Sequence, residues 1–219
     1  MKHPALFCAV AALLLSGVPS TYAQDTYYWY AGLGAGYSRV QFYPADFSFG
    51  GSPACSPRGP CTETKKEFDA GFKGFVGYQI NRNWAAEVSY VTLGKFHYKY
   101  NDGAVTQDGL YKVTGVGFSA IPTVPLTRNL SLYGRFGAFF SQTRLTFYNS
   151  GFTNGVSSDG RQVSGTSFLT GFGAQYFFAG ENGIRIEYEN FGTAGDCSNQ
   201  PCVGRANAKM ASANLIFKF

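Results

Sequence analysis

Apolar and polar residues alternate along eight segments of this chain, and many apolar positions hold aromatic or β-branched residues. Alternation with a period of two places successive side chains on opposite faces of a β-sheet, so each segment predicts a strand. The predicted strands cover residues 27–41, 67–80, 84–96, 111–122, 130–146, 166–178, 183–191 and 208–219.

The connections between these strands alternate between short and long. Three are short, at 81–83, 125–129 and 179–182, and four are long and polar, at 42–66, 97–110, 147–165 and 192–207. An up-and-down antiparallel meander with all of its long loops at one end gives this order.

The two faces of the predicted strands differ in chemistry. One face carries no charged residue in any strand and holds side chains such as Leu33, Phe136 and Phe172. The opposite face holds the charged strand residues and most of the strand glycines. A soluble sandwich would gain nothing from glycine on its exposed face, whereas a small membrane barrel has lipid outside and a crowded interior. We therefore predict an all-β fold, an eight-stranded antiparallel up-and-down transmembrane β-barrel.

Composition agrees with a membrane barrel better than with a soluble enzyme. Aromatic residues reach 17%, 28 of 219 residues are glycine, and charged residues are 14%, against about 25% in a typical soluble domain. After the N-terminal region there is no apolar run long enough for a transmembrane helix. This combination is typical of an exported chain whose strands contact lipid.

Residues 1–23 are predicted to be a secretory signal peptide. Lys2 and His3 precede an apolar run from Ala5 to Val18, which is too short for a transmembrane helix of about 20 residues. Cleavage after Ala23 leaves one barrel domain, residues 24–219, which retains 17 of the 18 basic residues and all 13 acidic ones. The net charge of 17 − 13 = +4 is too small to predict a nucleic-acid partner.

The exported part contains four cysteines in two close pairs, Cys55 with Cys61 and Cys197 with Cys202. An even number of cysteines in an exported protein predicts disulfides. Neither pair includes histidine, and the spacings match no common zinc site. We expect one bridge within each pair, with pairing between the two loops as the alternative, and we expect no metal or other cofactor.

Charged residues on the glycine-rich face predict a polar barrel interior. An eight-stranded barrel is just wide enough for side chains to fill, and buried charges must be paired. We favour a neutralised plug of side chains, and a narrow pore for small solutes or ions is the alternative. The residues concerned are Lys73, Glu87, Arg135, Arg185, Glu187 and Lys218.

Aromatic residues near the strand ends predict a membrane girdle, because amphipathic rings favour the headgroup level. These are Trp29, Tyr78, Trp84 and Tyr176. Other aromatics fall in the predicted long loops, where they belong either to an upper girdle or to an exposed binding surface. These are Phe42, Tyr43, Phe47, Phe49, Tyr148 and Phe152.

Several segments resemble strands of OmpA-like outer-membrane barrels. Residues 29–38 (WYAGLGAGYS) resemble the opening strand, and 77–81 (GYQIN) with 84–88 (WAAEV) resemble the first periplasmic hairpin. Residues 132–137 (LYGRFG) and 184–188 (IRIEY) resemble strands five and seven. The resemblance covers nearly the whole exported part, and the closing alternation of Leu215, Phe217 and Phe219 looks like the C-terminal assembly signal of this class.

The resemblance implies a bacterial outer-membrane location with both termini in the periplasm. It implies membrane lipid, the barrel-assembly machinery and periplasmic chaperones as partners of a monomeric chain. It also implies interior charges at Glu87 and Arg185, whereas Ile121 and Gln175 stand where a family member has charges. The family's soluble peptidoglycan-binding domain is not expected after Phe219.

The predicted function is a structural or surface-interaction role, in envelope integrity or in adhesion through an extracellular ligand of the long loops. The alternatives are a narrow pore and a lipid-modifying enzyme. Catalysis would need a nucleophile and an orienting acid beside His97, and no serine near it lies in a recognisable motif. We therefore expect a solvated loop histidine and no enzymatic activity.

Overall fold

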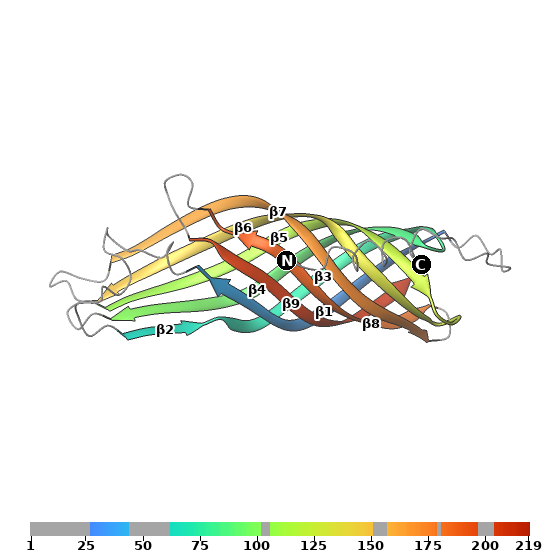
Figure 1. Cartoon of the computed structure of the whole chain (residues 1–219), viewed down its shortest axis with the longest axis horizontal. Helices are drawn as coiled ribbons and strands as arrows, with labels where there is room; N and C mark the ends of the chain where they lie inside the picture. Colours follow the sequence, from blue (N-terminus) through green and yellow to red (C-terminus); the bar gives the residue numbers. More distant parts are fainter. Residues whose placement is uncertain (1–26, 44–61, 102–105, 151–156, 179–180, 197–203) are drawn as a thin grey trace, which may run out of the picture.

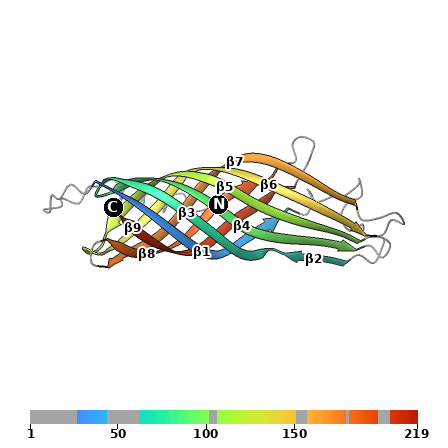
Figure 2. The ribbon, with the colours of Figure 1, turned by 180° about the vertical axis from the view of Figure 1, so that it is seen from behind.

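The protein forms a closed, elongated β-barrel in the computed structural model (Figures 1 and 2). The structure describes residues 27–43, 62–101, 106–150, 157–178, 181–196 and 204–219. These residues contain nine strands: β1 (Tyr28–Phe42), β2 (Thr62–Lys66), β3 (Phe68–Asn81), β4 (Trp84–Asn101), β5 (Thr106–Pro125), β6 (Leu130–Ser150), β7 (Ser157–Phe178), β8 (Asn182–Ala194) and β9 (Ala206–Lys218).

Antiparallel pairing between β1 and β9, and between β4 and β5, closes the barrel. Eight strands make up the wall, which confirms the predicted fold. The additional strand β2 precedes β3, separated from it by Glu67, and pairs with residues 97–101 at the distal end of β4. It lies in a segment that was predicted to be a loop. We call the end with the connections after Asn81, Pro125 and Phe178 the turn end, and the opposite end the loop end. Phe219 pairs with Trp29 at the turn end.

Strands β4 to β7 extend further toward the loop end than predicted. They reach 101, 106, 150 and 157, where the sequence pattern indicated ends at 96, 111, 146 and 166. Together with β2 they form the left end of the molecule in Figure 1. Their outward positions there are polar, for example Lys112 and Gln162. The predicted loops 97–110 and 147–165 were therefore too long.

Glycine bulges change the alternation of two strands. In β4 the register shifts between Thr92 and Lys95 around Gly94, whose φ is +93°. In β8 it shifts around Gly192, whose φ is +70°. Glycine adopts positive φ without the steric cost of a Cβ atom. Beyond the first bulge, Phe96 points inward instead of outward, and alternate residues carry polar groups to the outside.

The predicted outward face is confirmed in all eight wall strands. Every position assigned to it is exposed or partly exposed, with Leu33 at 70% and Phe172 at 65%. At the turn end Trp29 lies 5.0 Å from Tyr78, and Trp84 lies 6.1 Å from Phe136, between ring centroids. Trp29, Tyr78 and Trp84 therefore lie on the outward face near the turn end, where the sequence predicts a girdle.

Interior glycines make room for large side chains of neighbouring strands. A Cβ atom on Gly77 would lie 2.2 Å from Cζ of Tyr30, and one on Gly115 would lie 2.5 Å from Cζ of Phe139. Both aromatic rings are buried. The glycine-rich face is therefore the crowded inside of the barrel, as the sequence indicated.

Within the described residues, no helix has the length and apolar character that a bilayer-spanning helix requires.

Candidate functional site in the barrel interior

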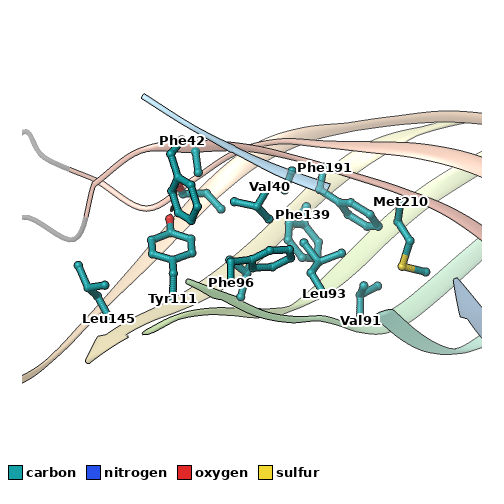
Figure 3. Close-up of a cluster of buried hydrophobic side chains, with 14 of the residues drawn as sticks. Val40, Phe42, Val91, Leu93, Phe96, Tyr111, Phe139, Leu145, Phe191 and Met210 are labelled. Carbon is teal, nitrogen blue, oxygen red and sulfur yellow. Dashed lines mark hydrogen bonds between the residues drawn. The ribbon is translucent and has the colours of Figure 1, made fainter. Parts of the chain in front are cut away.

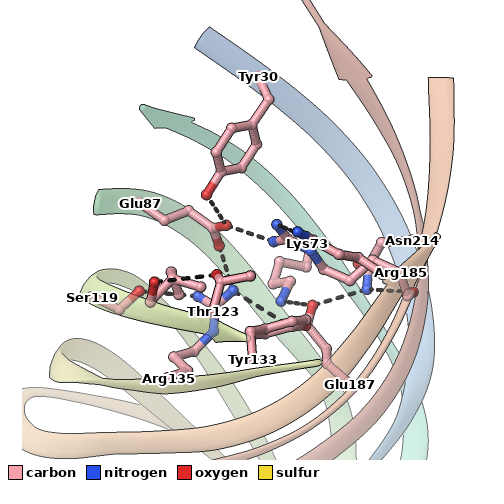
Figure 4. Close-up of polar contacts among 12 residues, drawn as sticks. Tyr30, Lys73, Glu87, Ser119, Thr123, Tyr133, Arg135, Arg185, Glu187 and Asn214 are labelled. Atoms are coloured by element: carbon pink, nitrogen blue, oxygen red, sulfur yellow. Dashed lines mark hydrogen bonds and ion pairs between the residues drawn. The ribbon is translucent and has the colours of Figure 1, made fainter. Parts of the chain in front are cut away.

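Three cations and three carboxylates meet in the middle of the barrel (Figure 4). They come from β3, β4, β6 and β8, and their side chains are almost completely buried. We call this set the ionic network; its members are Lys73, Glu87, Arg135, Arg185, Glu187 and Glu189. Because the charges are equal in number, the network has no formal net charge when all six groups are ionised.

Glu187 on β8 is a central acceptor of the network. Its carboxylate forms an ion pair with Lys73 on β3, and lies 3.2 Å from Nη2 of Arg135 on β6. The Tyr133 hydroxyl donates a hydrogen bond of 2.8 Å to it, and Asn214 Nδ2 donates one of 2.9 Å. Its oxygens therefore receive donors from several strands around the barrel.

Glu87 on β4 connects the two arginines. It forms an ion pair with Arg135, and Nη1 of Arg185 lies 2.6 Å from its Oε2. The Tyr30 hydroxyl donates a third hydrogen bond of 3.2 Å. Hydrogen bonds between ionised groups are stronger than neutral ones, so these contacts tie β1, β4, β6 and β8 together across the interior.

Glu189 is a member of the network that the sequence analysis missed. Its carboxylate lies 2.8 Å from Nζ of Lys73 and 3.2 Å from Nε of Arg135. It stands two residues after Glu187 on the same face of β8, so the alternation of that strand could have identified it.

Arg185 lies among aromatic rings as well as carboxylates. Its guanidinium carbon is 5.3 Å from the ring centroid of Tyr30, 4.7 Å from Phe75 and 4.9 Å from Tyr133. Nη2 also donates to Gln175 Oε1 at 3.0 Å. A planar, weakly hydrated guanidinium suits such a buried aromatic setting better than an ammonium would. Gln175 thus serves this arginine as a neutral acceptor.

Lys218 was predicted to join the interior charges, and the structure places it elsewhere. Its Nζ lies 3.5 Å from the ring centroid of Phe177 and 4.6 Å from that of Tyr28, at the turn end. Among the described residues it contacts no member of the ionic network. The difference arises because Lys218 is the last residue of β9, far along the strand from Asn214 and the network.

A large apolar cluster fills the interior between the ionic network and the loop end (Figure 3). The rings of Phe139 and Phe191 lie 4.8 Å apart across it. We call this set the apolar core; its buried members are Val40, Phe42, Val91, Leu93, Phe96, Tyr98, Tyr111, Val113, Phe139, Leu145, Leu169, Phe191, Ala194, Ala206, Ala208 and Met210. On the turn side of the network, a second apolar cluster holds Tyr30, Phe75, Ala85, Ile121, Tyr133, Phe177 and Ile216.

The apolar core accounts for one of the loop aromatics. Phe42 was expected either in an upper girdle or on a binding surface, but it is buried, 5.3 Å from Tyr111 and 6.1 Å from Tyr98. The Tyr111 hydroxyl donates to the carbonyl of Ala194 at 3.1 Å, and burial raises the pKa of this hydroxyl. Tyr43 is exposed, with the guanidinium of Arg205 5.9 Å from its ring.

Other predicted site residues lie outside the described part of the structure, or outside the interior. The four cysteines, Cys55, Cys61, Cys197 and Cys202, fall in undescribed segments, as do Phe47, Phe49 and Phe152, while the side chain of Tyr148 is not described.

His97 lies on strand β4 and not in a loop. Its exposed ring places Nδ1 3.7 Å from Asp108 Oδ1. Within the described ranges, no group of three His, Cys, Asp or Glu residues is arranged to hold a metal ion.

Comparisons with known proteins agree with this architecture. Outer membrane protein A of Serratia marcescens is 30% identical over 222 residues, an alignment that covers 100% of this chain and 56% of the relative. The protein of the same name from Escherichia coli O157:H7 is 28% identical over 224 residues and is covered to 55%. The chain thus spans little more than half the length of these relatives.

Solved structures show the same fold at low sequence identity. Neisserial surface protein A matches with a TM-score of 0.51 and 15% identity, covering 87% of this chain and 97% of that one. The outer membrane protein OprG from Pseudomonas aeruginosa matches with a TM-score of 0.51 and 13% identity, covering 90% and 99%. The family model of the OmpA-like transmembrane domain matches residues 23–219. The chain therefore belongs to the family of OmpA-like transmembrane domains and is a β-barrel of the bacterial outer membrane.

Proposed function

We propose that this protein is a structural and surface-interaction barrel whose interior is closed to solutes. The observation that carries the proposal is that three layers of side chains fill the barrel interior one after another. An apolar cluster, the neutral ionic network and the apolar core follow one another along the barrel axis. A solute would have to displace both paired charges and packed rings to pass. The proposal includes no catalytic activity.

The ionic network and the apolar core are two different barriers in series, and together they close the interior better than either alone. Separating the ion pairs leaves buried charges uncompensated, which costs several kcal/mol. Opening the apolar core removes close-packed side chains such as Phe139 and Phe191 from their contacts. We expect the protein to stay closed when one layer alone is weakened.

Conductance across planar lipid bilayers tests closure. The native protein, a core variant (Phe139→Ala/Phe191→Ala) and a network variant (Glu87→Ala/Arg135→Ala) should give currents like those of a protein-free bilayer. The network variant removes one charge of each sign, so the interior stays neutral. The fourfold variant should conduct, and heat-modifiable gel mobility checks that each variant is folded. Steady single-channel currents from the native protein would instead establish the narrow pore.

We further propose that residues 1–23 are a cleaved signal peptide and that the turn end faces the periplasm. Short connections and the C-terminal residue share the turn end, which supports this orientation. The surface-interaction role would then belong to the long connections at the loop end, and barrel-assembly machinery and periplasmic chaperones would act on the exported chain. An epitope inserted between residues 151 and 156 should be detected on intact cells. Detection only after the outer membrane is permeabilised would contradict the orientation.

A further inference from the structure

Three cations stand side by side on the outside of the barrel, beyond the apolar band. Lys95 on β4 is directly opposite Lys112 on β5, and Lys112 is directly opposite Arg144 on β6. All three side chains are exposed. We call this set the cationic row. It ends at β7, where Nη2 of Arg144 lies 3.3 Å from Gln162 Oε1.

Residues directly opposite each other in an antiparallel sheet have Cβ atoms about 5 Å apart, and like charges there are destabilising. Among the described residues, no carboxylate forms an ion pair with any member of the row. The Asp69 carboxylate accepts a hydrogen bond from the backbone N–H of Lys95 at 2.6 Å, and pairs with the ammonium of Lys66 at 3.8 Å. The fold therefore concentrates positive charge that an external anion could neutralise.

The Gly94 bulge places Lys95 in the row. Without the register shift after Thr92, residue 95 would continue the inward set of Val91 and Leu93, and Phe96 would point outward. The bulge exchanges the two side chains, so that Phe96 enters the apolar core and the ammonium reaches the outside. A φ of +93° at this position is costly for any residue except glycine.

The height of the row matches a membrane surface. Among the described side chains, Phe140 is the last large apolar residue on the outward face of β6, and Arg144 stands four residues further. At about 3.3 Å per residue and a strand tilt of about 40°, the row lies roughly 10 Å beyond the apolar band. Long basic side chains can also reach back toward lipid headgroups.

The distribution of basic residues is different at the turn end. Arg82 and Arg128 are exposed there, in two separate turns, and Glu181 is exposed in the region of the third. No cross-strand row of cations forms at that end of the described structure. The positive surface therefore favours one face of the membrane over the other.

We propose that the cationic row binds the phosphate groups of a phosphorylated glycolipid in the outer leaflet. The leaflet assignment rests on the orientation proposed above. Lysine and arginine are the usual partners of phosphate, and adjacent cations can share one multivalent anion. The glycolipid's acyl chains would lie against the apolar outward face of β5 and β6, continuous with the row through Phe140 and Phe118, whose rings are 5.8 Å apart.

Native mass spectrometry of the detergent-solubilised, folded protein tests the proposal. The probes are lipid A with two phosphate groups, dephosphorylated lipid A and inorganic phosphate. Lys95→Gln/Lys112→Gln should lower retention of phosphorylated lipid A roughly ten-fold or more, since each charge-assisted contact is worth more than 1 kcal/mol. The charge-matched control, Arg82→Gln/Arg128→Gln, should retain this lipid like the native protein.

Several outcomes would overturn the proposal. The row does not recognise phosphate if the row variant retains phosphorylated lipid A as well as the native protein does. The same conclusion follows if the native protein retains dephosphorylated lipid A as well as the phosphorylated form. Strong binding of inorganic phosphate with no retention of lipid A would assign the row to a soluble anion. Binding in detergent does not depend on conductance or orientation. An epitope result against the proposed orientation would therefore overturn the leaflet assignment alone.

Discussion

Replacing Lys73 by methionine would remove one of three cations from the ionic network. Its Nζ pairs with both Glu187 and Glu189, and afterwards these two carboxylates would share Arg135, each at 3.2 Å. Methionine fills similar space, so the main change is electrostatic. Removing one partner of a buried ion pair costs about 3–5 kcal/mol, and we expect Lys73→Met to lower the free energy of unfolding by that amount.

A compensating substitution separates charge balance from packing. Lys73→Met/Glu189→Gln leaves two cations and two carboxylates in the network. The double variant should be more stable than Lys73→Met, with a coupling energy of about 1–3 kcal/mol between the two sites. Lys112→Met is the matched control, because it removes the same charged group from the outer surface. Its effect should stay within about 0.5 kcal/mol.

Urea titration of the protein in phosphatidylcholine vesicles measures these differences. The chain contains two tryptophans, Trp29 and Trp84, and both lie on the outward face, so their fluorescence reports insertion. The reasoning fails if Lys73→Met costs less than about 1 kcal/mol, or if the two substitutions are simply additive. Either result would mean that water or local rearrangement compensates the unpaired carboxylate.

Four further predictions concern the lipid-facing surface, the Gly94 bulge, the C-terminal residue and the cysteine pairs. Phe136→Arg places a charge on the lipid face at a cost of about 2–4 kcal/mol, so heat-modifiable gel shifts should show less inserted protein. Gly94→Ala should cost about 1–3 kcal/mol in the urea titration, because an added Cβ would lie 2.6 Å from the Ala70 carbonyl oxygen and φ is positive. Unchanged stability would argue against the bulge. Deleting Phe219 should reduce outer-membrane yield while export continues, and equal yield would remove its role as an assembly signal. Peptide mapping without reduction should find internal disulfides in segments 55–61 and 197–202, and free thiols there would contradict the bridges.

The faces of the barrel could be predicted from sequence because lipid imposes a strict pattern. A charged residue facing hydrocarbon is costly, so every second position must stay apolar over the membrane-spanning part of each strand. Leu33, Phe136 and Phe172 follow that pattern, and all three point outward. Glycines such as Gly77 identified the opposite face as the interior, because the absence of a side chain is an advantage only where large neighbouring side chains need the space.

The distal parts of β4 to β7 could not be predicted, because lipid no longer constrains their outward face. Lys99 and Gln107 pair with neighbouring strands near the loop end, yet such polar segments read as loops. The bulge at Gly94 added a second difficulty. It shifts the alternation of β4 by one, so Phe96 and His97 each face the side opposite to the one expected from the preceding residues.

The pairing of charges within the ionic network could also not be predicted from the sequence. The charged residues could be assigned to the interior one strand at a time, but Lys73 and Glu187 are 114 residues apart. Their contact depends on the relative heights of β3 and β8, which the barrel shear sets. Lys218 was wrongly grouped for the same reason, since alternation gives the face of a residue and not its height along the barrel axis. Glu189 is different, because the alternation of β8 places it on the same face as Glu187.

The distribution of polarity reverses along the barrel, and the bulges lie close to the reversal. On the turn side of Gly94 the outward face is apolar and the interior holds the ionic network. On its loop side the outward face carries Lys95 and Lys112, while the interior is the apolar core. The distal part therefore has the polarity of a water-soluble barrel, and its core is stabilised by the hydrophobic effect as in a soluble domain. Because β6 continues ten residues past Phe140, about 30 Å of strand can hold the connecting loops clear of the membrane surface. An extension of this kind suits the surface-interaction role proposed above, because binding and recognition residues are commonly found on loops that a scaffold of regular structure positions.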